Sequence, residues 1–197
     1  KKEEISKQLS FNQEMIMKPE EKIELEKIIV KDDLTFEKLK SIFNGEKVFL
    51  YENKYGYVIG NIRKVFYVPT YHQNIGIRNF EIDLLKEFFS NSNSKIITYN
   101  AKDILKKMPL NNLFFDTYIA NYLITANTKD DFFTIVERVT GENISKEILD
   151  KEENCINLDD FAEFSFLCFE NLLNVYFDFE KGLKTQNLEK LYFEIEL

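Results

Sequence analysis

"KVFLYENKYGYVIGNIRKVFYVPT", residues 47–70, contains three short segments that are rich in Val, Ile, Phe and Tyr. These residue types favour β-strands, so we predict strands over 47–53, 55–62 and 64–70. The connections between the segments are too short for crossovers, and consecutive strands should therefore pair antiparallel. We expect this stretch to form the sheet on which the rest of the chain packs.

On either side of this stretch the pattern indicates helices and further strands. "IIV" (28–30) indicates a short strand, and "KIITYN" (95–100) indicates a buried one. Three antiparallel strands, followed by parallel strands that alternate with helices, indicate an α/β fold with a ribonuclease-H-like mixed sheet flanked by helices. Helices are predicted over 35–43, 77–90, 101–108, 116–125, about 130–139 and 157–181.

The composition is that of a folded domain. Of the 197 residues, 44% are hydrophobic and 15% aromatic, which is enough for a sizeable core and excludes a disordered chain. The net charge of -8 disfavours tight nucleic-acid binding by this chain alone, because proteins that grip phosphate backbones present a basic face. We find neither a signal peptide nor an apolar run long enough to span a membrane.

The cysteines and the histidine do not suggest a metal site. The chain has Cys155, Cys168 and a single histidine, His72. These residues form no ligand cluster, which disfavours zinc, and we expect two reduced thiols in a cytoplasmic protein. His72 lies in a polar stretch after a predicted strand, so we expect a solvated loop side chain rather than a catalytic one.

Three stretches, "ITYNAKDIL" (97–105), "FFDTYIANYLI" (114–124) and "LEKLYFEIEL" (188–197), carry a resemblance to a known family. They resemble the 3′–5′ exonuclease domain of bacterial DNA polymerase I, in the family A DNA polymerases. "FFDTYIANYLI" (114–124) is similar to that family's Phe-Asp-Thr-x-x-Ala-x-Tyr-Leu-Leu segment. "ITYNAKDIL" (97–105) is similar to its Asn-x-Lys motif, and "LEKLYFEIEL" (188–197) resembles the junction to the polymerase domain.

The resemblance covers nearly the whole chain in order and implies three parts. Residues 1–28, charged and with sparse apolar positions, would be a linker or arm from an upstream domain. Residues 29–185 would be the exonuclease-like domain. Residues 186–197 would begin the junction to the polymerase domain.

The resemblance also implies which positions would hold metals. Active members bind two divalent ions through four carboxylates, and these ions clamp the attacking and leaving oxygens of the phosphodiester. Mg²⁺ and Mn²⁺ require such oxygen ligands. Carried onto this chain, three carboxylate positions are Leu50, Ile104 and Ser165, and Glu52 alone is retained. Phe161 stands where the family has a water-orienting Tyr, so we predict that no catalytic residue and no metal site remain.

Neighbouring carboxylates are poor substitutes. Asp103 lies one residue before Ile104, and one residue corresponds to a rotation of about 100° around a helix. Glu163 is displaced in the same way from Ser165. We therefore expect Glu52 to be an isolated strand carboxylate, paired with Lys102 or with water.

Asp116 precedes the apolar helical run at 117–125, and an Asp at this position can accept hydrogen bonds from amides of the first helical turn. We predict a helix cap. In the family that the chain resembles, this Asp is not a metal ligand.

The leading prediction is a catalytically inactive, proofreading-type domain that supports the DNA-synthesising domain of a DNA polymerase I. The parent chain would bind DNA in the bacterial cytoplasm, associated with the nucleoid. This segment would contact the polymerase domain within the same chain and would need no cofactor and no membrane.

Two alternatives stay open. One is a divergent 3′–5′ exonuclease that acts on DNA ends, dependent on Mg²⁺ or Mn²⁺ and built from Glu52, Asp103, Asp116 and Glu163. The other is a non-enzymatic adaptor whose exposed aromatic side chains stack on bases. Its candidate residues are Tyr67, Tyr71, Tyr99 and Tyr118.

Overall fold

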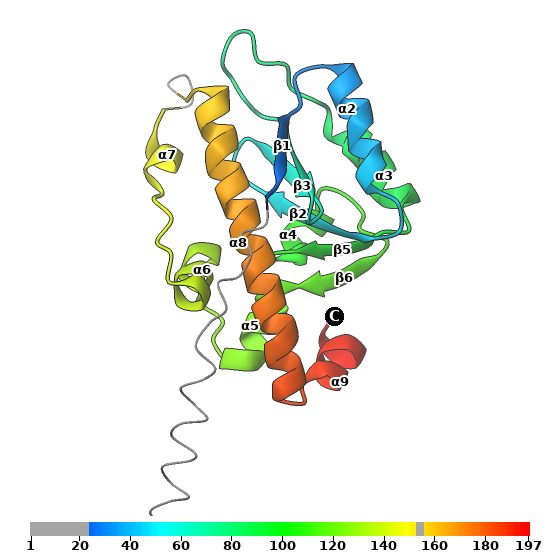
Figure 1. Ribbon diagram of the computed structural model, residues 1–197, viewed down its shortest axis with the longest axis vertical. Coiled ribbons are helices and arrows are strands. Elements are labelled where there is room, and N and C mark those ends of the chain that lie inside the picture. The colour runs from blue at the N-terminus through cyan, green and yellow to red at the C-terminus, as the bar shows by residue number, and fades with distance from the viewer. Residues whose placement is uncertain (1–23, 153–155) are drawn as a thin grey trace, which may run out of the picture.

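A six-stranded mixed sheet forms the centre of the molecule (Figure 1). The computed structural model describes residues 24–152 and 156–197. The spatial order of the strands is β1-β4-β3-β2-β5-β6. Their bounds are β1 (Glu26–Ile29), β2 (Lys47–Glu52), β3 (Gly56–Gly60), β4 (Lys64–Pro69), β5 (Lys95–Thr98) and β6 (Leu113–Asp116).

The central strands pair as predicted. β2 pairs antiparallel with β3, and β3 pairs antiparallel with β4. β1 pairs parallel with β4, β5 with β2, and β6 with β5. Three antiparallel strands therefore carry parallel strands on both sides, which confirms the predicted mixed sheet.

The edge strand β6 was missing from the prediction, which placed only a helix from residue 116. β6 has four residues and passes directly into the helix, with Asp116 as its last residue. So short a run shows no alternation of polar and apolar residues, and pairing with β5 alone makes it a strand.

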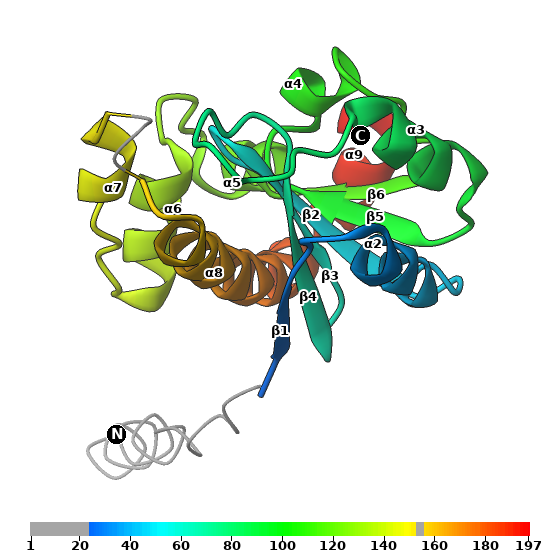
Figure 2. The same ribbon diagram turned by 90° about the horizontal axis from the view of Figure 1, so that it is seen from above.

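Helices cover both faces of the sheet (Figure 2). α5, α6 and the long α8 contribute to a hydrophobic cluster on one face, and α2, α3 and α4 contribute to a second cluster on the other. The α-helices are α2 (Asp33–Leu39), α3 (Ile82–Asn91), α4 (Ala101–Leu105), α5 (Thr117–Thr125), α6 (Phe132–Thr140), α7 (Glu147–Asp150), α8 (Leu158–Thr185) and α9 (Glu189–Leu191). A 3₁₀ turn spans Lys40–Ile42, and a π-helical turn spans Tyr192–Glu196.

The alternation of β2 side chains divides this strand between the two clusters. Phe49 and Tyr51 belong to the α8 cluster, whereas Val48 and Leu50 belong to the α4 cluster. This period of two is the ordinary strand geometry. It places Leu50, and Glu52 two residues further on, at the face of the sheet that α4 covers.

The structure describes the C-terminal end of the chain through residue 197, but at the N-terminal end it describes only residues from 24 onward. Residues 1–23 of the predicted arm lie outside the described residues, and β1 begins at Glu26, inside the range assigned to that arm. At the other end, Tyr192 is buried against Phe115. Within 24–152 and 156–197, no helix combines the length and the apolar character needed to cross a membrane.

Candidate functional site

Two of the four positions that the resemblance assigns to metal carboxylates are part of the hydrophobic core. Leu50, in β2, and Ile104, in α4, are buried and belong to the same cluster. Their side chains offer no oxygen ligand, and they pack on the face of the sheet where Glu52 lies. This part of the site therefore has the composition of a core rather than of a metal centre.

Glu52 is held by two donors at the end of β2. Its Oε1 accepts a hydrogen bond from Tyr57 Oη at 2.8 Å and one from Lys107 Nζ at 2.6 Å. The Glu52 side chain is 14% exposed and that of Lys107 is 45% exposed. Burial, together with the hydrogen bond to Glu52, raises the pKa of Tyr57, so this hydroxyl keeps its proton and remains a donor.

The prediction that Glu52 pairs with Lys102 was wrong. Lys102 is the second residue of α4, whereas Lys107 lies two residues beyond the last residue of α4, Leu105, and reaches the end of β2. The turn after α4, rather than the helix itself, therefore brings the ammonium to the carboxylate.

The fourth position, Ser165, lies in α8 and forms neutral hydrogen bonds. Ser165 Oγ donates to the carbonyl of Phe161 at 2.6 Å and accepts from Asn53 Nδ2 at 2.7 Å. Asn53 Oδ1 in turn accepts from the backbone N–H groups of Tyr55 and Gly56. Ser165 thus connects α8 to the turn between β2 and β3, and these two partners of its hydroxyl are groups of the protein.

Phe161 is separated from Leu50 and Ile104 by the sheet. Its ring packs on that of Tyr55 with 4.9 Å between centroids, in the cluster on the α8 face. Leu50 and Ile104 lie in the cluster on the opposite face. The structure therefore brings Leu50, Glu52 and Ile104 together, and it does not bring Phe161 to them.

The carboxylates considered as substitutes are engaged elsewhere. Asp103 accepts hydrogen bonds from Lys106 Nζ at 2.6 Å and from Asn100 Nδ2 at 2.5 Å, and the bond from Lys106 is the main reason that its pKa is lowered. Glu163 is exposed and lies 3.7 Å from Lys27 Nζ. Within the described parts of the chain, no three His, Cys, Asp or Glu side chains are grouped so that they could hold a metal ion. The residues present do not fit the two-metal site.

Asp116 is the N-cap residue of α5 and binds more than its own helix. Its Oδ1 accepts from the N–H groups of Tyr118 at 2.8 Å and Asn100 at 3.0 Å, and its Oδ2 accepts from Ala101 N–H at 2.7 Å. Asn100 has a φ of 55°, a left-handed conformation that Asn tolerates. Burial raises the pKa of Asp116, while the three amide bonds act in the opposite direction.

The backbone of Asp116 also binds the C-terminal segment. Tyr192 Oη accepts from Asp116 N–H at 2.6 Å and donates to its carbonyl at 3.1 Å. Sequence reasoning missed this contact, because nothing near residue 192 indicates a partner 76 positions away. One residue therefore joins the β5–α4 turn, the start of α5 and the chain end.

The prediction that His72 is a solvated loop residue was also wrong. His72 is 6% exposed, and its Nε2 lies 2.6 Å from Tyr67 Oη. Its ring is enclosed by those of Tyr55 and Phe161. Polar neighbours in the sequence suggested exposure, but the segment folds back over aromatic rings. Cys168 is a buried free thiol, and Cys155 lies outside the described residues.

The aromatic side chains proposed for base stacking do not form an exposed platform. Tyr67 is buried in the α8 cluster, and Tyr99 packs edge to face against Tyr118 and Phe132. Tyr71 is 47% exposed. Tyr67 is therefore excluded as a base-stacking residue of the adaptor hypothesis, because its ring is buried.

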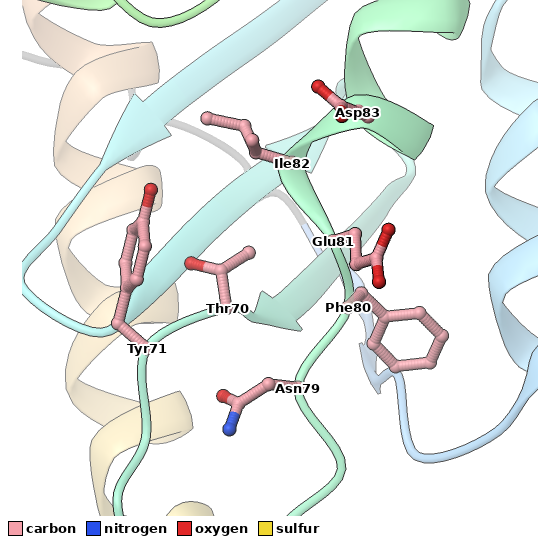
Figure 3. A pocket seen from close by; sticks show the side chains of 7 residues that line it. All are labelled: Thr70, Tyr71, Asn79, Phe80, Glu81, Ile82 and Asp83. Atoms are coloured by element: carbon pink, nitrogen blue, oxygen red, sulfur yellow. The ribbon is translucent and has the colours of Figure 1, made fainter.

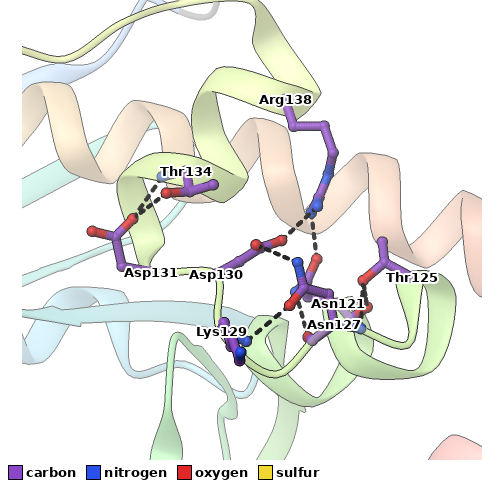
Figure 4. Close-up of polar contacts among 8 residues, drawn as sticks. All are labelled: Asn121, Thr125, Asn127, Lys129, Asp130, Asp131, Thr134 and Arg138. Carbon is purple, nitrogen blue, oxygen red and sulfur yellow. Dashed lines mark hydrogen bonds and ion pairs between the residues drawn. The ribbon is translucent and has the colours of Figure 1, made fainter.

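A polar network between α5 and α6 is satisfied internally (Figure 4). Arg138 donates to Asp130 Oδ2 at 2.6 Å and to the side-chain oxygen of Asn121. Asn127 Nδ2 donates to the other Asp130 oxygen at 2.6 Å. The network fixes the turn between the helices and leaves none of these charged groups directed at a ligand.

No family model matches the chain, and no curated protein sequence matches it. Solved structures do. The catalytic core of RRP6 from Trypanosoma brucei gives a TM-score of 0.62 at 15% identity, covering 87% of this chain and 50% of that one. Escherichia coli RNase D, an exoribonuclease involved in structured RNA processing, gives 0.63 at 11% identity, covering 84% and 47%. Brucella melitensis NrnC with bound Mg²⁺ gives 0.56 at 11% identity, covering 85% and 84%.

At these identities the likeness shows the fold alone. The chain spans about half the length of the RRP6 core and of RNase D. It has the α/β exonuclease-like fold with a ribonuclease-H-like mixed sheet flanked by helices, as predicted.

Proposed function

We propose that the chain is a catalytically inactive 3′–5′ exonuclease-like domain of a DNA polymerase I, and that it supports the DNA-synthesising domain. The observation that carries this proposal is the ion pair that Glu52 forms within the chain. The one retained carboxylate is paired with Lys107, and Leu50 and Ile104 form a hydrophobic contact layer on the same side of the sheet.

Two-metal phosphodiester hydrolysis needs several oxygen ligands around ions about 3.5–4 Å apart. A single carboxylate that already accepts two hydrogen bonds cannot provide them. Clustered carboxylates also repel one another unless metals neutralise them, so replacement by Leu and Ile favours a closed core at this point. We propose accordingly that this segment needs no cofactor.

The supporting role is favoured by the contact between Asp116 and Tyr192. The segment 186–197, which resembles the start of the junction to the polymerase domain, is bonded through Tyr192 to the last residue of β6. A junction bonded to the sheet would hold the next domain in one orientation. In this proposal DNA is bound by the parent polymerase in the bacterial cytoplasm, and this domain contacts the polymerase domain within the same chain.

The test is a degradation assay on 5′-labelled single-stranded DNA and RNA, with Mg²⁺ or Mn²⁺. We expect no shortening by the wild-type chain beyond that in buffer, and the same result for Glu52→Gln. A nuclease contaminant would act equally in both preparations. Shortening by the wild type that disappears in Glu52→Gln would overturn the proposal.

The second candidate function is a divergent exonuclease on DNA ends, dependent on Mg²⁺ or Mn²⁺. It is favoured by the likeness to an exoribonuclease and to a structure with bound Mg²⁺. Thermal unfolding separates the two candidates independently of activity, because an ion that binds only the folded state raises the unfolding midpoint. An inactive domain should unfold at the same midpoint in millimolar Mg²⁺ and in a chelator.

A further inference from the structure

Residues 71–79, within the segment between β4 and α3, form neither helix nor strand, and we call them the strap. Its base is closed by two reciprocal bonds. His72 N–H donates to Asn79 Oδ1 at 2.8 Å, and Asn79 Nδ2 donates to the His72 carbonyl at 2.7 Å. Ile75, at the tip, is exposed. The strap is also bonded to the core at its first residue, where Tyr71 N–H donates to the Tyr55 carbonyl at 3.1 Å, so movement of the strap as a unit has to break this bond.

The His72 side chain attaches this unit to the core. The imidazole is buried, with Tyr67 Oη at 2.6 Å and with ring centroids 5.2 Å from Tyr55 and 5.7 Å from Phe161. A further bond, from Asn74 Nδ2 to the Ile156 carbonyl, ties the strap to the segment before α8.

The surroundings of the imidazole favour its neutral form. Tyr67 on β4 and Tyr55 in the β2–β3 turn are the titratable groups that face it, and Phe161 faces it from α8. In the described part of the chain, no carboxylate bonds to the ring. The Lys54 ammonium lies 5.0 Å from the Tyr55 ring centroid. Burial lowers the pKa of His72 and raises that of Tyr67, so Tyr67 donates to a neutral imidazole.

We propose that the strap is a pH-operated latch, closed on the core while His72 is neutral and released when His72 is protonated. Protonation turns Nε2 from an acceptor into a donor, so Tyr67 Oη can no longer donate a hydrogen bond to it. It also places a positive charge away from water in a site where no carboxylate of the described residues bonds to the ring, and the loss of hydration is costly. Withdrawal of the strap returns the charged ring to solvent, while β4 keeps its strand pairing.

Release of the strap would widen the surface hollow between the end of β4 and the start of α3. Figure 3 shows Thr70 and Tyr71 on one side of this hollow, and Phe80 to Asp83 on the other, where α3 begins. Thr70 Oγ1 is buried there and has no hydrogen-bond partner among the residues that the structure describes. Movement of Tyr71 with His72 would open the hollow and uncover the rings of Tyr55 and Phe161.

His72 is the only histidine of the chain, so its ring gives a single, assignable NMR titration. We expect a midpoint below the ordinary value of about 6.5. In parallel, amide hydrogen exchange of the strap, corrected for intrinsic rates, should show an opening constant that rises as the pH falls from 6.5 to the lower midpoint of the closed state, at most about tenfold per pH unit, since one proton is taken up on opening in that range. Amides of β2 and β5 serve as the internal control and should show no such slope.

Two variants make the result decisive. His72→Gln keeps an acceptor for Tyr67 but cannot titrate, and its strap should open with no pH slope. Tyr67→Phe removes the donor to the neutral ring, and its His72 midpoint should rise toward 6.5. A flat pH dependence in the wild type, the same slope in His72→Gln, or an unchanged midpoint in Tyr67→Phe would overturn the proposal.

Discussion

Lys107 Nζ lies 2.6 Å from Glu52 Oε1, so the chain's own ammonium meets the single carboxylate retained among the four metal positions. The ion pair joins the turn that follows α4 to the end of β2. Both charges of this pair come from the chain itself, and their contribution to the stability of the fold can be measured.

Glu52 and Lys107 should stabilise the fold as a coupled pair. Lys107→Met and Glu52→Gln are each expected to lower the free energy of unfolding by about 0.5–1 kcal/mol, because the pair is partly solvated. In the double variant the two losses should not add, since either change alone breaks the pair. Urea unfolding of the four proteins measures the coupling.

The matched control is Lys106→Met, which removes a lysine whose partner Asp103 is about half exposed. We expect little change there. Additive losses for Glu52 and Lys107 would show that the contact in the structure contributes no coupling in solution.

Asp116→Ala should destabilise the fold more than the loss of an ordinary helix cap. Its carboxylate accepts three backbone N–H bonds, two of them from the β5–α4 turn, and the substitution leaves buried donors unsatisfied. We expect a loss of about 2–4 kcal/mol. Asp131→Ala removes the more exposed cap of α6 and should cost about 1 kcal/mol. A nuclease activity that is lost in Asp116→Ala at unchanged stability would contradict the structural role.

Asp131 should make stability depend on pH in the acid range. Burial alone would raise its pKa, but hydrogen bonds from Lys146 and Thr134 outweigh this and lower the pKa to about 2. The folded value lies below the unfolded value of 3.8, so the stabilisation is fully present above pH 3.8 and is lost as the pH falls toward 2.

Because the side chain is about half exposed, we expect only about 0.5–1 kcal/mol from this group. The measurement is the difference in unfolding free energy between the wild type and Asp131→Asn, at pH 5 and at pH 2.5. The difference should shrink at the lower pH. A constant difference would show that the ionised carboxylate is not the source.

Tyr192→Phe should loosen the C-terminal segment. The hydroxyl bonds both the N–H and the carbonyl of Asp116, and its removal leaves buried backbone groups of β6 without partners. We expect a loss of about 1–3 kcal/mol and faster amide exchange over 189–196. Tyr118→Phe, whose hydroxyl bonds the exposed Thr128 carbonyl, is the control and should leave that exchange unchanged.

Local patterns in the sequence were enough to predict the central strands and the fold class. The runs rich in Val, Ile, Phe and Tyr in 47–70 predict the strands, and the short connections between them predict antiparallel pairing. Asp116 before an apolar run likewise predicts a cap, since the amides that it binds in α5 lie within one helical turn. Such signals depend on neighbours two to four positions away, so they can be recognised in the sequence without knowledge of the fold.

The tertiary structure alone decided which distant groups meet. Glu52 and Lys107 are 55 positions apart, and Asp116 and Tyr192 are 76 apart. No local periodicity encodes such pairs, because they depend on how α4 and the chain end approach the sheet. The burial of His72 follows from the path of the strap over the aromatic rings, and β6 exists as a strand because β5 lies beside it. The sequence by itself determined the central strands and most of the helices, because those signals are local. Packing between the elements determined that β6 pairs with β5 and that Glu52 faces the Lys107 ammonium.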